Sequence, residues 1–240
     1  MALPILTALL LVMAMLTGGG SQDRGWGDAL TQLLAWPVLL LAAWQLASTP
    51  APRARAWLVA LAAAVPIALA AQWLTGLSLS PWATERSLWS VLPAVVAFLA
   101  ALALPRRELQ QLAWLFVALA GFSLVLGYLQ LGAPQDSPLN PFPQWQPALN
   151  GLFANPNHQA TSIAVALVIV LAWLVHDDEQ DRDGRWWATR VAIGGLGLFL
   201  LVGLPLTGSR GAVLVAIAGL LAVPVANGWL DRRWRRHRRL

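Results

Sequence analysis

The sequence contains no cysteine and no lysine, and only 11% of its 240 residues are charged. Without cysteine, the chain has no disulfide framework, no thiolate metal ligand and no thiol nucleophile. It also lacks a phosphate-binding Gly-Lys-Ser/Thr loop, a His-Glu-x-x-His zinc motif and the Gly-x-Ser-x-Gly motif of serine hydrolases. We therefore expect neither a metal nor a cofactor in this protein.

The composition is instead strongly apolar. Apolar residues make up 58% of the chain and the mean hydropathy is +0.62, whereas a soluble domain has about 45–50% apolar and about 25% charged residues. A helix that crosses a bilayer needs about 20 predominantly apolar residues. The sequence therefore predicts an all-α fold, a polytopic bundle of about eight transmembrane helices in one domain of residues 1–240. The predicted spans are 3–17, 30–46, 57–74, 88–104, 112–131, 160–175, 191–206 and 212–226.

All 16 basic residues are arginines, and their placement alternates along the chain. With the N-terminus in the cytoplasm, only Arg24, Arg86 and Arg210 fall on the outer side of the membrane, and all other arginines are cytoplasmic. This asymmetry follows the positive-inside rule and predicts that both termini are cytoplasmic. The basic tail at 227–240 is then an orientation signal and an anchor for anionic lipid. We expect no nucleic-acid partner, because no soluble module surrounds the tail.

A long outer loop at 132–159 is rich in proline and asparagine, and it leads directly into an apolar helix. Asn155 or Asn157 is suited to cap that helix, with Pro156 near its first turn. The free N–H groups at the start of a helix favour an anion such as phosphate. His158 belongs to the same block, where a single histidine is more typical of a hydrogen-bonding cap than of a base.

A second feature is the short outer turn Leu206–Ala212, which contains Ser209 and Arg210. An arginine close to the membrane is costly and usually faces a polar cavity or a partner. Its guanidinium keeps its charge and binds phosphate with two parallel hydrogen bonds. An interfacial arginine that only caps a tight turn is an equally good interpretation of this position.

These two blocks together resemble the bacterial O-antigen ligase family. The segment Gly151–Ala160 is similar to the block that opens a membrane helix in those ligases and in the related pilin oligosaccharyltransferases. The turn Leu206–Ala212 is similar to their short outer turn with its Ser-Arg pair. The two blocks occur in the family's order, with matched spacing and on the same predicted side of the membrane.

The resemblance implies a reaction at the periplasmic face of a bacterial inner membrane. Family members transfer a glycan from undecaprenyl diphosphate to lipid A-core, to a protein or to a growing glycan. Arg210 matches the arginine that engages the carrier's diphosphate, and is the expected catalytic residue. Ser209, Asn155, Asn157 and His158 match the motifs around it, and are the expected substrate-binding residues.

The sequence also departs from the family. Family members carry a further large periplasmic loop with another arginine and a histidine base, and this sequence ends before such a loop. His158 matches the helix-opening block and not that base. The pattern predicts an incomplete ligase, which is either a truncated gene product or fragment, or a chain whose other half is supplied by a second polypeptide. Two alternatives stay open: a transporter or flippase for lipid-linked solutes, and a non-catalytic membrane subunit.

Overall fold

The structure is a computed structural model that describes residues 2–17, 26–50, 52–134, 136–140, 149–175 and 184–237. The side chains of residues 184–185 and 229–237 are not described. The middle of the predicted outer loop, at 141–148, and the last three residues of the predicted basic tail therefore lie outside the described residues.

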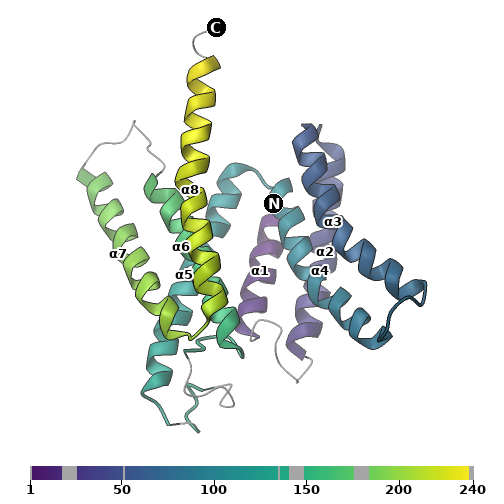
Figure 1. The fold of residues 1–240 in the computed structure, drawn as a ribbon, viewed down its shortest axis with the longest axis horizontal. Coiled ribbons are helices and arrows are strands. Elements are labelled where there is room, and N and C mark those ends of the chain that lie inside the picture. The colour runs from purple at the N-terminus through teal and green to yellow at the C-terminus, as the bar shows by residue number, and fades with distance from the viewer. Residues whose placement is uncertain are drawn as a thin grey trace. The chain divides into compact units, whose positions relative to one another are not determined.

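The elements that the described residues form are all helices, with no strand among them, as Figure 1 shows. Each predicted span overlaps one helix, and seven of the helices are long and apolar enough to cross a membrane. The first helix is shorter, at 15 residues. The predicted polytopic helical bundle is thus confirmed. The helices are α1 (Ala2–Leu16), α2 (Trp26–Ser48), α3 (Arg53–Leu74), α4 (Pro81–Ala103), α5 (Arg106–Leu131), α6 (Pro156–Val175), α7 (Gly184–Leu206) and α8 (Arg210–His237).

The chain divides into two compact units, residues 1–115 and 116–240, and each is described by itself. The first unit holds α1 to α4 and the beginning of α5, with α4 packed against α1, α2 and α3. The second unit holds the rest of α5 together with α6, α7 and α8, and α6 packs against both α7 and α8. The single domain expected from the sequence stays a prediction.

The core of the first unit is formed mainly by α2 and α4. Ala35, Val38 and Ala42 of α2 are completely buried, as are Val96 and Ala100 of α4. All five are alanine or valine, and small side chains let helix backbones approach closely where lipid removes most of the hydrophobic driving force.

The outer surface of the helices is apolar, as expected for a protein solvated by lipid. In the spanning part of α3 no residue is buried, although its mean hydropathy is 1.9.

Hydroxyl groups on the helices are satisfied locally: those of Thr7, Thr31, Ser87 and Ser90 each donate to the carbonyl four residues earlier at 2.8 Å. A bilayer offers no water to such groups, so these bonds remove an otherwise unpaired donor.

Candidate functional site at the starts of α6 and α8

The helix α6 begins with an asparagine cap. The Asn155 side-chain Oδ1 accepts the N–H of Asn157 at 2.8 Å, and the Asn155 carbonyl accepts the N–H of His158 at 3.0 Å. Pro156 is the first helical residue, where its missing N–H is no loss. Of the two residues expected to cap, Asn155 does so and Asn157 is exposed. The loop predicted at 132–159 therefore ends at 155, because the cap and the proline start the helix four residues earlier than predicted.

The helix α8 begins in a similar way, with a serine cap. The Ser209 hydroxyl, in a residue that is only 8% exposed, accepts the N–H of Ala212 at 3.3 Å. The preceding Thr207 hydroxyl accepts the N–H of Ser209 at 3.3 Å, which fixes the turn. Arg210 follows as the first residue of α8, and it is exposed. The Ser209 hydroxyl is therefore engaged in capping, and its expected role in binding a substrate stays a prediction.

The two helices lie side by side and run in the same direction, as the path of α6, α7 and α8 in Figure 1 shows. Asn227 near the far end of α8 donates from Nδ2 to the Val175 carbonyl at the end of α6, at 3.5 Å. Nearer the middle, a Cβ atom on Gly219 would lie 2.5 Å from the side chain of Val168. Residues of α8 are thus paired with residues of α6 that lie 51 or 52 positions earlier.

The same register places Arg210 at the level of His158, which lies 52 positions earlier. The buried alanines fit this pairing, since Ala212 follows Ala160 at the same spacing and all belong to one core cluster. His158 is half-buried, and Arg210 forms no ion pair with any other described residue. The starts of α6 and α8, with the exposed Arg210 at the first position of α8, therefore occupy one end of the second unit.

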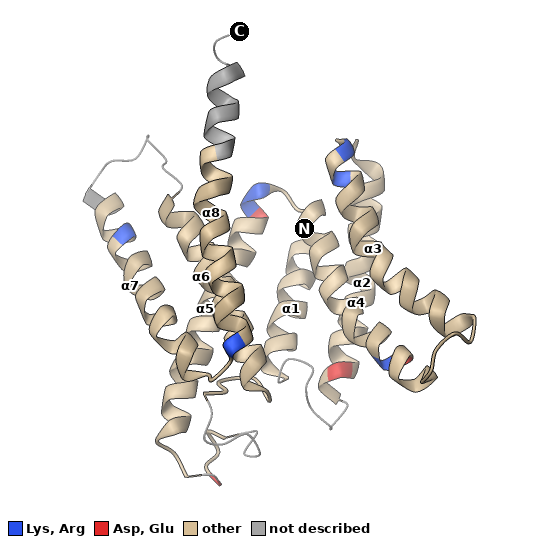
Figure 2. Cartoon of the chain, viewed as in Figure 1, with Lys and Arg blue, Asp and Glu red and all other residues tan. Residues whose placement is uncertain are grey.

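The electrostatics of this end favour an anion. The N-terminus of a helix carries about half a positive elementary charge, and the effect is confined to the first turn. Here two such ends point the same way beside a full positive charge on Arg210. The cartoon in Figure 2, coloured by residue type, shows how few charged residues the described helices carry elsewhere along their lengths. A cation at the N-terminus of a helix is unfavourable by itself, so this arrangement is stabilised when a phosphate-like group binds.

Behind the start of α6, buried polar side chains attach the preceding loop to α5. The Gln130 amide donates to the Gly151 carbonyl at 2.8 Å and accepts the Gly151 N–H at 2.9 Å. Two helical turns earlier, the Ser123 hydroxyl donates to Gln159 Oε1 at 2.5 Å and accepts the Leu152 N–H at 2.9 Å. These bonds hold residues 151 and 152 at a fixed position against α5, directly ahead of the Asn155 cap.

Two buried amide groups in this region have unsatisfied atoms. Asn150 is 2% exposed, and neither its Nδ2 nor its Oδ1 has a hydrogen-bond partner. Gln159 is completely buried, and its Nε2 is also without a partner. An unpaired buried amide group is destabilising by about 1–3 kcal/mol. Both residues lie next to the capped start of α6. Among the described residues of the second unit, buried polar side chains are concentrated in this region.

The structure brings together Arg210, Ser209, Asn155, Asn157 and His158 at one end of one unit. Sequence reasoning missed the residues behind them. For Ser123 and Gln130 the only available signal was a polar side chain in an apolar stretch of α5, whereas Gln159 lies in the Gly151–Ala160 block and Asn150 directly precedes that block. The missed residues are Ser123, Gln130, Asn150 and Gln159.

The seven helices of spanning length define the chain as a multi-pass helical membrane protein. No protein-family model, no curated protein and no solved structure matches it. The resemblance to O-antigen ligases therefore depends on the two sequence blocks, and what it implies stays a prediction.

Proposed function

We propose that this protein acts in glycan transfer from a lipid-linked donor, in the manner of an O-antigen ligase. The donor is a glycan on undecaprenyl diphosphate, and the acceptor is a hydroxyl of lipid A-core, with a protein or a growing glycan as alternative acceptors. The observation that carries the proposal is the pair of parallel helix starts at α6 and α8, with Arg210 at their level. This arrangement suits a group with several negative oxygens, and a diphosphate is such a group.

In the proposed reaction, the bond between the sugar's anomeric carbon and the diphosphate oxygen breaks. A new bond forms between that carbon and the acceptor oxygen, and the acceptor's proton is released to a base or to water. Negative charge builds up on the departing diphosphate. Arg210 and the free N–H groups of both helix starts stabilise this charge, because they are already oriented before the reaction begins. Asn155 and Ser209 contribute by fixing those helix starts, and act as positioning residues.

The same proposal sets the orientation of the chain. The starts of α6 and α8 face the periplasm of a bacterial inner membrane, where the lipid-linked donor is used. Both termini and the basic tail then face the cytoplasm, in agreement with the distribution of arginines. In this proposal the chain is sufficient for transfer, and a need for a second polypeptide that supplies the acceptor base is one outcome of the complementation experiment.

The experiment that tests the proposal is complementation of a strain that lacks its O-antigen ligase, with the lipopolysaccharide ladder read on a gel. The chain is expressed as wild type, Arg210→Lys and Arg86→Lys, and membrane levels are matched by immunoblot. Arg86 is likewise exposed near the start of a helix but lies in the first unit, so it is the control. We expect the wild type and Arg86→Lys to restore the ladder. Arg210→Lys keeps the positive charge but loses the bidentate hydrogen bonding of the guanidinium to phosphate. We therefore expect a ladder at least about tenfold weaker than that of the wild type.

An absent ladder with normal insertion would contradict transfer by this chain alone. Accumulation of undecaprenyl-linked glycan in radiolabelled lipid extracts then shows whether the donor is consumed. Loss of that accumulation on expression would indicate transfer of the glycan to another acceptor. With an unchanged amount, a larger share of the glycan exposed at the periplasmic face would indicate transport or flipping of the carrier, and an unchanged share would indicate a non-catalytic membrane subunit.

A further inference from the structure

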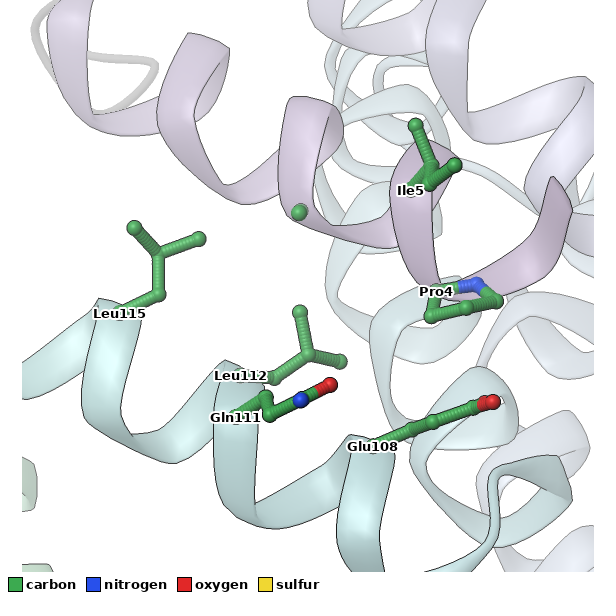
Figure 3. A pocket seen from close by; sticks show the side chains of 7 residues that line it. Pro4, Ile5, Glu108, Gln111, Leu112 and Leu115 are labelled. Atoms are coloured by element: carbon green, nitrogen blue, oxygen red, sulfur yellow. The ribbon is translucent and has the colours of Figure 1, made fainter. Parts of the chain in front are cut away.

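The first unit contains a groove of about 360 Å³ between the starts of α1 and α5. In Figure 3 the α5 side chains that line it extend toward α1. The two helices enter the groove in the same direction, with low residue numbers at the same end. Its walls are formed by Pro4, Ile5 and Ala8 of α1 and by Glu108, Gln111, Leu112 and Leu115 of α5.

The groove is polar at one end and apolar along the rest of its length. On α5, Glu108, Leu112 and Leu115 follow each other at the spacing of one helix face. From the carboxylate to the last leucine, the helix rises about 10 Å. The polar end coincides with the first turn of α5, a helix of 26 residues that is long enough to cross the membrane. The groove therefore begins at the headgroup level and continues beside the acyl chains of a bilayer.

The polar end carries both signs of charge. Glu108 lines the groove and is partly exposed. Arg107 is exposed and lies one turn before Gln111 on the same helix face, so it borders the same end. Neither Glu108 nor Arg107 forms an ion pair with another described residue. A ligand that satisfies both groups carries a phosphate for the guanidinium and a cation with N–H donors for the carboxylate.

We propose that this groove binds one phosphoglyceride whose headgroup carries a primary ammonium, as in phosphatidylethanolamine. The ammonium donates to the Glu108 carboxylate, the phosphate binds Arg107, and one acyl chain packs along Ile5, Leu112 and Leu115. A choline headgroup has a cation without N–H donors, and a glycerol headgroup has no cation. Glu108 therefore selects the amine among lipids with identical acyl chains. The site lies in the first unit, and it is independent of the anion site at α6 and α8.

The test measures lipid retention by the full chain purified in mild detergent, using native mass spectrometry. The probes are dioleoyl phosphatidylethanolamine, dioleoyl phosphatidylcholine and dioleoyl phosphatidylglycerol at equal concentrations. We expect the wild type to retain the ethanolamine lipid about two- to fivefold more than the choline lipid, the upper part of the range for one accessible ion pair. Glu108→Gln should abolish this preference and leave choline-lipid binding unchanged. Leu112→Trp fills the groove and should reduce retention of all three lipids.

The matched control is Glu85→Gln, which removes a partly exposed carboxylate from α4 that does not line the groove. It should keep the wild-type preference. Equal retention of the ethanolamine and choline lipids by the wild type overturns the proposal, and this comparison requires no variant. A preference that survives Glu108→Gln also overturns it. Stronger retention of the glycerol lipid by the wild type would show that Arg107 binds lipid phosphate without help from the carboxylate, which equally contradicts the selection of an amine.

Discussion

Gln130 and Gly151 exchange two hydrogen bonds, with the glutamine amide donating to the glycine carbonyl and accepting the glycine N–H, at 2.8 and 2.9 Å. A side chain of α5 thus forms with the loop backbone the same pair of hydrogen bonds that a neighbouring β-strand would form. The Gln130 Nε2 also donates to the Leu139 carbonyl at 2.9 Å, so one side chain ties two parts of the outer loop to α5. Gln130 itself is 1% exposed, so water is not a substitute for these bonds.

Gln130→Met should strongly destabilise the protein. The substitution keeps the shape of the side chain but leaves one N–H and two carbonyls of the loop without a partner. Each unpaired buried group is worth about 1–3 kcal/mol, so we expect a loss of at least ~3 kcal/mol. Thermal unfolding in detergent, followed by tryptophan fluorescence, measures this change. The control is Gln110→Met, which alters an exposed glutamine of the same helix. Equal melting temperatures for the two variants would show that the loop is held by other contacts.

Gly151→Ala should be more harmful than the same change at Gly208. Both glycines have a positive φ, of 60° and 75°, and an alanine in this conformation is strained by about 1–2 kcal/mol. A Cβ atom on Gly151 would also collide with Ser123 and with Gln159, whereas one on Gly208 would meet nothing within 4 Å. Overpacking adds about 1–3 kcal/mol. We expect the lower melting temperature for Gly151→Ala, and the reverse order would contradict the contacts around Ser123.

The helices were predictable from the sequence because lipid imposes a length and an apolar composition on each of them. The start of α6 was also predictable in kind, since asparagine caps and a proline at the first position are local signals. The contacts behind it were not. Ser123 and Gln159 are 36 residues apart, and Gln130 and Gly151 are 21 apart, so no local periodicity connects them. Even the level of His158 relative to Arg210 depends on the register of α6 against α8, which hydropathy leaves undefined.

Asn155→Ala should weaken the start of α6 more than Asn157→Ala does. Asn155 Oδ1 accepts a backbone N–H at 2.8 Å, and loss of such a cap costs about 0.5–2 kcal/mol. The exposed side chain of Asn157 makes no comparable bond in the described part of the chain. Asn155→Asp keeps the cap and should melt close to the wild type. A larger shift for Asn157→Ala would indicate that the helix is capped by the second asparagine.

The orientation of the chain can be measured by single-cysteine labelling, because the native sequence has no cysteine. Asp136→Cys lies in the loop after α5, and Arg53→Cys lies at the start of α3, and both positions are exposed. An impermeant maleimide should label residue 136 from the periplasm, after the outer membrane is opened. Residue 53 should be labelled only after the inner membrane is broken. Labelling of both residues from the same side would contradict the orientation deduced from the arginines.

Arg210→Gln should separate function from stability. The guanidinium is exposed at the first position of α8, where a positive charge faces the positive end of the helix dipole. Removing it should leave the melting temperature unchanged or raise it, by an amount equivalent to about 0.3–1 kcal/mol. The same variant should lose the lipopolysaccharide ladder that the wild type restores. Among the described residues at the starts of α6 and α8, Arg210 is the only arginine, so without it the diphosphate has no full positive charge beside it. Arg86→Gln, at an exposed position of α4, should keep the ladder.

A destabilised Arg210→Gln would instead assign the arginine a structural role, and a stable variant that retains the ladder would remove it from the site. The ladder and the melting temperature together therefore distinguish a residue kept for its ligand from one kept for the fold.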